Sequence, residues 1–171
     1  MNSKLLLRTL VICFLIVVNI GCDQVSKIII REKVQPYEMV SLLSNHLTVT
    51  RVENSGAFLS AGDSLPAAAR QILLVILPVL AMIGGLAYLF LRRGISRLAI
   101  TGLCCILGGG AGNLFDRFTY GSVTDFLHLR FGVFQTGIFN LADVSVMTGL
   151  GLLLVHGIMQ SGQKLAPSLL S

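Results

Sequence analysis

The chain has 171 residues, of which 54% are apolar and only 12% are charged, and its mean hydropathy is +0.81. Soluble domains carry about one-quarter charged residues, so this composition excludes an ordinary soluble protein and indicates one domain that lies largely in lipid. The net charge of +5 comes from short, dispersed clusters of Lys and Arg. Such clusters favour membrane-flanking positions over nucleic-acid binding.

Four apolar segments reach or approach the roughly 20 residues that a helix needs to cross a bilayer. We predict helices over about residues 5–22, 67–91, 98–115 and 141–159. Pro78 lies inside the second segment and predicts a kink, because proline removes one backbone donor. The sequence thus indicates an all-α integral membrane protein with four transmembrane helices, organised as a single membrane-embedded domain over residues 1–171.

Two polar stretches, residues 23–66 and 116–140, separate the predicted helices on one side of the membrane. Residues 39–50 are rich in Val, Leu and Thr with some alternation, so we predict a small β-sheet within about residues 38–60. The second stretch contains Gly121, Gly132 and Gly137, and we expect short loops there. The opposite side has only the turn 92–97 and both termini.

The distribution of basic residues bears on the orientation of the chain. The turn 92–97 contains three arginines, and Lys4 and Arg8 add to the positive charge on that side. Short loops follow the positive-inside rule best, so we expect this side and both termini in the cytoplasm. The charge count alone leaves the orientation open, because further cations follow the first helix on the other side: Lys27, Arg31 and Lys33.

The N-terminal segment also resembles the signal of a bacterial lipoprotein, in which Cys22 would be lipidated. Asn19, three residues before this cysteine, is polar where such signals carry Leu or a similar residue. We therefore predict a retained helix, with a Cys22-acylated scaffold as an alternative. The cysteines show no metal or disulfide spacing, so we expect buried free thiols at all of them: Cys13, Cys22, Cys104 and Cys105.

A run of small residues, 108–112, ends the third predicted helix. No Gly-Lys-Ser/Thr follows it, so a phosphate-binding loop is not indicated. Small residues let another backbone approach closely, either that of a neighbouring helix or that of an extended substrate.

Several acids lie where an apolar membrane makes charge costly, which commonly marks function. Asp143 lies just inside the fourth apolar segment, and Asp125 lies between apolar neighbours on an expected short loop. Each has a structural alternative, a helix N-cap for Asp143 and a turn for Asp125. Asp116 and Arg117 end the third helix, where they pair with each other or with other charges.

Other polar residues surround these acids. Asp23 and Lys27 have the i, i+4 spacing of a helical ion pair. Three amides near the predicted water boundary either hold a peptide backbone or cap helices: Asn54, Asn113 and Asn140. The histidines show no ligand spacing, and neither Gly-x-Ser-x-Gly nor His-Glu-x-x-His occurs. We therefore predict no metal site, and a serine or zinc hydrolase is disfavoured.

Five motifs, in order along the chain, resemble the lipoprotein signal peptidases, also called signal peptidase II. They extend from the end of the first helix to the fourth. The second motif departs from the usual Asn-Thr-Gly-Ala-Ala, which leaves the placement of its loop open. The motifs are Asp23-Gln24-Val25-Ser26-Lys27, Asn54-Ser55-Gly56-Ala57-Phe58, Gly109-Gly110-Ala111-Gly112-Asn113-Leu114-Phe115-Asp116-Arg117, Val123-Thr124-Asp125-Phe126 and Phe139-Asn140-Leu141-Ala142-Asp143.

This resemblance implies a multi-pass aspartic protease of the bacterial inner membrane, with a small periplasmic β-cradle and an active site that faces the periplasm. Its substrates would be lipid-modified prolipoproteins, cut just before a diacylglyceryl cysteine. It also implies sensitivity to globomycin-type inhibitors and contact with membrane lipid. Nothing in the sequence suggests an obligate partner, so we expect a monomer, and we expect no cofactor. The matching residues are the catalytic Asp125 and Asp143, and, in substrate binding or support, Asp23, Lys27, Asn54, Gly56, Asn113, Asp116, Arg117 and Asn140.

Two nearby carboxyl groups cannot both ionise cheaply, so such a pair shares a proton and can act as acid and base without a metal. A different class of function is the alternative. In a small four-helix carrier coupled to protons or cations, Asp143 and Asp116 would relay the ion.

Overall fold

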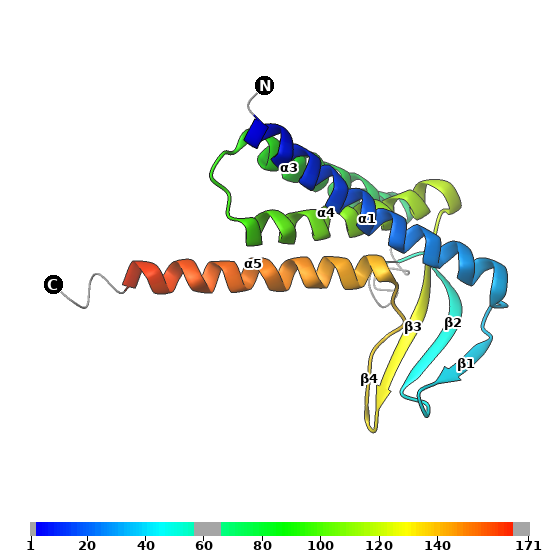
Figure 1. Ribbon diagram of the computed structural model, residues 1–171. Coiled ribbons are helices and arrows are strands. Elements are labelled where there is room, and N and C mark those ends of the chain that lie inside the picture. The colour runs from blue at the N-terminus through cyan, green and yellow to red at the C-terminus, as the bar shows by residue number, and fades with distance from the viewer. Residues whose placement is uncertain (1–2, 57–65, 166–171) are drawn as a thin grey trace.

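Long apolar helices and a small antiparallel sheet at one end make up the chain (Figure 1). The computed structural model describes residues 3–56 and 66–165, with side chains as far as Ser161 in the last helix. Four helical segments are long and apolar enough to cross a membrane: residues 3–33, 67–91, 97–120 and 141–161. The predicted fold, an all-α membrane protein with a small sheet, is confirmed.

The second span consists of three helical pieces in one continuous rod. A short π-helical turn lies just before Pro78, where the missing proline donor interrupts the regular α-helical pattern. The helices are α1 (Ser3–Lys33), α2 (Ala67–Gln71), η2 (Ile72–Ile76), α3 (Leu77–Leu91), α4 (Arg97–Tyr120) and α5 (Leu141–Leu165).

Three helices run past their predicted ends. The prediction stopped the first helix at residue 22, but α1 continues through the charged stretch to Lys33. This extension is helical because Asp23, Lys27 and Arg31, spaced four residues apart, share one helix face and pair with buried partners. α4 extends five residues beyond the predicted 115 and ends at Gly121, whose φ of +75° suits a glycine C-cap.

The sheet has four antiparallel strands in the order β1-β2-β3-β4. The predicted β region, 38–60, contains the first two strands, and its residues 57–60 lie outside the described part of the chain. The expectation of loops in the second polar stretch was wrong, because that stretch supplies two strands. The strands are β1 (Met39–Leu42), β2 (Leu47–Asn54), β3 (Val123–Phe131) and β4 (Phe134–Gln135).

Pairing of β2 with β3 brings distant residues together at the helical end of the sheet. Val52 lies opposite Asp125, and Asn54 lies opposite Val123. The first four residues of β3 are buried, and the strand contacts α1 and α4. Asp125 therefore sits in a buried strand and not on the short loop that the sequence suggested.

Glycines let α4 pack closely against its neighbours, and α4 contacts α1, α3 and α5. A Cβ at Gly102 would lie 2.9 Å from the carbonyl oxygen of Gly149 in α5. In the glycine run, a Cβ at Gly109 would collide with Ala142, also in α5, and one at Gly108 would lie 3.2 Å from a carbonyl oxygen of α1. These three glycines thus serve close contact between neighbouring helices.

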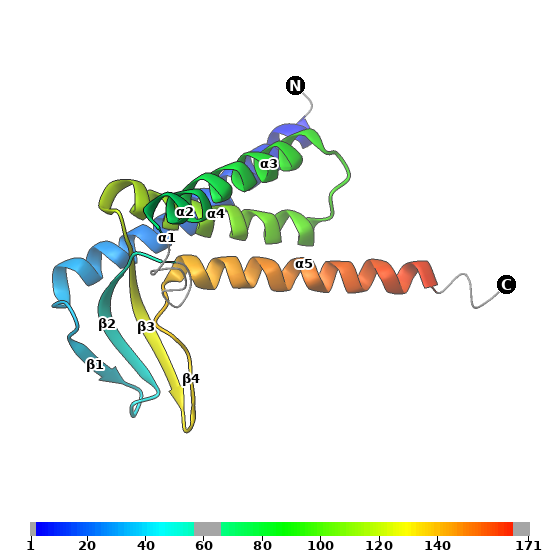
Figure 2. The same cartoon turned by 180° about the vertical axis from the view of Figure 1, so that it is seen from behind.

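A small apolar core joins α1, α3 and α4 at the end away from the sheet, seen from behind in Figure 2. Its buried members are Ile12, Leu89, Cys104 and Leu107. All four cysteines are free, but the expectation that all are buried was wrong, because Cys13 and Cys22 are exposed on α1.

Candidate active site

Asp125 and Asp143 meet where the sheet joins the bundle, and one asparagine contacts both. Asp125, in β3, is only 4% exposed, whereas Asp143, in the first turn of α5, is half-buried. The side-chain Nδ2 of Asn140 donates to Asp125 Oδ1 at 2.6 Å, and its backbone N donates to Asp143 Oδ2 at 3.2 Å. The two acids, one from a strand and one from a helix, therefore flank a single residue.

Two further asparagines complete the hydrogen bonding of this carboxyl pair. Asn54 Nδ2, at the end of β2, donates to Asp125 Oδ2 at 2.8 Å. Asn113 Nδ2, from α4, donates to Asp143 Oδ1 at 2.9 Å, and Asn113 Oδ1 accepts from Asn140 Nδ2 at 3.2 Å. Every oxygen of both carboxyl groups thus accepts a hydrogen bond, which fixes the orientation of the acids.

Burial raises the pKa of Asp125 from 3.8 to about 6. The negative charge of Asp143 also raises this pKa, whereas the hydrogen bonds from Asn54 and Asn140 lower it because they favour the ionised form. A carboxyl group that exchanges a proton near neutral pH, beside a second acid, can serve acid–base chemistry.

A buried ion network lies beneath the pair. Lys27 is fully buried, with Nζ 2.8 Å from Asp23 Oδ2 and 2.9 Å from Asp116 Oδ2. Arg31 adds a second cation, with Nη2 3.2 Å from Asp116 Oδ1. The Asp23–Lys27 ion pair that the spacing predicted is present, and Asp116 pairs with Lys27 and Arg31 rather than with Arg117.

The network is joined to the backbone beside each acid of the pair. Asp23 Oδ1 accepts from the backbone N of Ala142 at 2.9 Å, immediately before Asp143. Asp116 Oδ2 accepts from the backbone N of Thr124 at 3.3 Å, immediately before Asp125. Lys27 Nζ also donates to Asn113 Oδ1 at 3.0 Å. Asp23, Lys27 and Asp116 therefore fix the segments from which the carboxyl pair projects.

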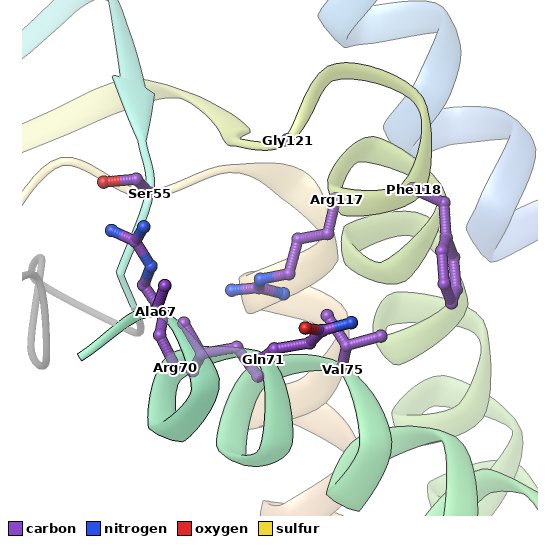
Figure 3. Close-up of a pocket in the computed structure, with 9 residues that line it drawn as sticks. Ser55, Ala67, Arg70, Gln71, Val75, Arg117, Phe118 and Gly121 are labelled. Carbon is purple, nitrogen blue, oxygen red and sulfur yellow. The ribbon is translucent and has the colours of Figure 1, made fainter. Parts of the chain in front are cut away.

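Arg117 and Gly56 are linked to the pair through Asn54. Arg117 Nη2 donates to Gly56 O at 3.1 Å, and Gly56 N donates to Asn54 Oδ1 at 2.9 Å. Figure 3 shows Arg117 and Arg70 facing one space between α4 and α2, a cavity of about 310 Å³. Ala57 and Phe58, the rest of the Asn54 motif, lie outside the described residues.

Sequence reasoning missed several members of the network. Arg31 Nε donates to Thr124 Oγ1 at 2.8 Å, and that hydroxyl donates to Glu53 Oε1 at 3.1 Å. Gln24 Nε2 donates to Asp116 Oδ1 at 3.1 Å. Arg31 could have been found from its spacing, because it follows Lys27 by one helical turn on the same face. Within the described ranges, no three His, Cys, Asp or Glu residues form a metal-binding group.

The chain is a polytopic membrane protein with four membrane spans, and at their sheet end two acids are hydrogen-bonded to a shared asparagine. The family model of signal peptidase (SPase) II matches residues 15–159, and the chain belongs to this family. It is therefore an aspartic peptidase of the membrane, in a family that removes signal peptides from lipoproteins.

Relatives named lipoprotein signal peptidase cover most of the chain. The protein of Halothermothrix orenii is 34% identical over 142 residues, 82% of this chain and 90% of the relative. That of Treponema denticola is 34% identical over 151 residues, 83% of this chain and 87% of the relative. That of Streptococcus pneumoniae is 31% identical over 145 residues, 85% of this chain and 90% of the relative.

Two solved bacterial membrane enzymes share the fold. One superposes with a TM-score of 0.80 at 21% identity, covering 90% of this chain and 91% of its own. The other has a TM-score of 0.75 at 20% identity, covering 85% of this chain and 91% of its own. The fold is therefore that of a known membrane enzyme.

Membership of a peptidase family sets aside the carrier and scaffold alternatives as the main function. The structure also offers no free relay at Asp116, which the carrier required. Asp116 is fully buried and held by the cations of Lys27 and Arg31.

Proposed function

We propose that this peptidase cuts diacylglyceryl-modified prolipoproteins just before the lipidated cysteine, with Asp125 and Asp143 as its catalytic pair. The observation that carries the pair is the double contact of Asn140, which hydrogen-bonds to both carboxyl groups. The substrate class follows from the relatives, whose names describe lipoprotein signal peptidases.

The reaction is a hydrolysis by one water molecule. Asp143 is the more accessible of the two acids, and its carboxylate takes a proton from the water molecule. The oxygen of this water attacks the scissile carbonyl carbon at the same time. Asp125, buried and with a raised pKa, gives its proton to the carbonyl oxygen. Asp143 then gives the proton it took from water to the cysteine nitrogen, while Asp125 takes a proton back from a hydroxyl of the tetrahedral intermediate. The C–N bond breaks, the cysteine leaves as an amine, the signal peptide leaves as a carboxylic acid, and both acids return to their starting states.

Bound substrate favours this division of roles. A signal-peptide helix that enters the site displaces water, which strengthens the preference of buried Asp125 for its neutral form. The asparagines keep both acids aligned, so little reorganisation is needed in the transition state. Arg117, which lines the cavity in Figure 3, and Gly56, whose carbonyl oxygen accepts from Arg117, are candidates for contact with the substrate backbone.

The position of the pair suits a lipid-bearing substrate. Asp143 lies in the first turn of a membrane span, at the boundary between bilayer and water, so the acyl chains can stay in lipid while the peptide reaches the acids. Globomycin-type inhibitors would occupy the same place and compete with substrate.

Charge supports a periplasmic site in the bacterial inner membrane. The end away from the sheet has no acidic residue among those described, and its cations are Lys4, Arg8, Arg92, Arg93 and Arg97. All acids that the structure describes belong to the sheet half: Asp23, Glu32, Glu38, Glu53, Asp116, Asp125 and Asp143. The positive-inside rule counts basic residues in short loops, so the three arginines of the turn 92–97 favour the cytoplasm for this end. Labelling of single cysteines at Ser41 and Ser96 in intact cells tests this, since only the Ser41 position should react from outside.

The substrate assignment is tested with purified protein and a synthetic precursor peptide that carries the diacylglyceryl cysteine. Mass spectrometry should find one cut, immediately before that cysteine, and much slower cleavage of the peptide that lacks the lipid. Cleavage at another bond, or equal rates for both peptides, would contradict the assignment.

A further inference from the structure

A groove between α1 and α4 opens at the end opposite the sheet. In Figures 1 and 2 the two helices cross near their middles and separate towards their N-terminal ends. The groove has a volume of about 790 Å³ and a mainly apolar wall that includes Leu7, Val11, Leu15 and Ile100. Its rim carries three cations, Lys4, Arg8 and Arg97.

A second cavity, of about 270 Å³, adjoins the rim and adds a fourth cation. It is lined by Arg93 and shares Lys4, Arg8 and Gly94 with the groove. Among the residues that the structure describes, this end of the bundle contains no Asp or Glu, so its net charge is positive.

Arg8 joins the N-terminal part of α1 to the C-terminus of α3. Its Nη2 donates to the carbonyl oxygens of Leu89 at 2.7 Å and Arg92 at 2.9 Å, which closes the C-terminus of α3. Both acceptors are neutral carbonyls, so the positive charge of Arg8 stays available to an anion at the rim.

We propose that the groove binds an anionic membrane phospholipid, with its phosphate at the cationic rim and one acyl chain along Leu7, Val11 and Leu15. The length of the groove fits this ligand. From Lys4 to Leu15 an α-helix rises about 16 Å, close to half of the roughly 30 Å hydrocarbon core, the depth of one leaflet.

Both features of the groove are needed to select this ligand. A soluble anion would use the cations but gain nothing from the apolar wall, and a zwitterionic lipid would use the wall but not the net positive charge. Basic pockets between membrane helices are suited to anionic headgroups. The inference depends only on the membrane spans and is independent of the proposed catalytic pair.

The test uses the full-length protein, stripped of lipid and titrated with phosphatidylglycerol or phosphatidylcholine of the same acyl chains, with bound lipid counted by native mass spectrometry. Each cation near a membrane surface contributes about a fivefold preference. Arg93→Gln/Arg97→Gln should therefore weaken phosphatidylglycerol binding roughly 25-fold and leave phosphatidylcholine binding unchanged. Arg51→Gln/Arg130→Gln, the matched charge change on the sheet, should alter neither.

A second arm tests the apolar wall. Val11→Trp fills the groove from a half-exposed position and should reduce binding of phosphatidylglycerol while the cations remain. Equal losses in the rim and sheet variants would show a general charge effect and overturn the site. Displacement of the lipid by millimolar inorganic phosphate, or full binding in both Arg93→Gln/Arg97→Gln and Val11→Trp, would overturn it as well.

Discussion

Asn140 and Asp143 close a reciprocal pair of hydrogen bonds at the start of α5. The backbone N of Asp143 donates to Asn140 Oδ1 at 3.0 Å, and the backbone N of Asn140 donates to Asp143 Oδ2 at 3.2 Å. This is the geometry of a capping box, in which a helix start satisfies its own donors. The N-cap is therefore Asn140, and Asp143 is the third residue of the helix rather than the N-cap that its position in the sequence suggested. The capping box holds the Asp143 carboxylate beside Asn140, which also contacts Asp125.

Replacement of Asn140, compared with loss of a helix cap elsewhere, tests whether this residue contributes to catalysis beyond the stability of α5. Asn140→Ala loses the donor to Asp125 and the cap of α5, so we expect kcat/KM to fall about 100-fold and stability to fall by about 1 kcal/mol. The matched control is Ser96→Ala, which removes the N-cap of α4 at the far end of the bundle. It should lose similar stability and keep its activity. Equal activity losses in both variants would show that Asn140 acts only through helix stability.

Lys27 should be essential for stability because it is buried between two carboxylates. Lys27→Met leaves Asp23 and Asp116 buried with like charge, and we expect a loss of about 3–5 kcal/mol, measured by unfolding in detergent micelles. Lys33→Met, an exposed change on the same helix, should cost little. Adding Asp116→Asn to Lys27→Met should restore part of the loss, and a double variant less stable than Lys27→Met would contradict this account.

The pH dependence follows from the raised pKa of Asp125. The proposed acid must hold a proton, and it loses that proton as pH rises through about 6, so kcat/KM of the free enzyme should fall above this pH. Asn54 donates to the ionised form and lowers the pKa. In Asn54→Ala the alkaline limb should therefore move to higher pH, whatever the loss in rate. A limb that stays in place, or moves to lower pH, would count against Asp125 as the proton donor.

Close packing of α4 against α5 depends on glycine at position 149. A Cβ there would meet the carbonyl oxygen of Gly102 and the side chain of Ile106, so Gly149→Ala should cost about 1–3 kcal/mol. Gly151→Ala, two residues further along the helix and in open space, should be neutral or slightly stabilising, because alanine favours helix. Thermal unfolding of the two variants side by side measures the difference, and equal unfolding temperatures would contradict the packing account.

The apolar segments predicted the four spans because their signal is local, with runs of apolar residues long enough to cross a bilayer. The helical extension of α1 was missed because Asp23, Lys27 and Arg31 lower the hydropathy. Only the fold shows that their charges are matched, since Asp116 comes from α4.

The strand β3 was missed for a related reason. Aspartate is rare in strands, so Asp125 suggested a turn. Its burial depends on Asn54 and Asn140, which come from elsewhere in the chain. The residues of the candidate site could be named from motif order, but their hydrogen bonds follow from the pairing of β2 with β3 and the packing of α4 on α5.

The central claim concerns the two acids and is tested most directly by single-turnover cleavage of the lipidated precursor. Asp125→Asn and Asp143→Asn keep the shape of each side chain but remove its acid–base function, so each should reduce cleavage at least 1,000-fold. Their double variant should be no slower than either, because the pair acts as a unit. Glu38→Gln, the same change at an exposed residue before β1, should cleave at the normal rate. Folded Asp143→Asn protein that cleaves as fast as the unchanged enzyme would contradict the account.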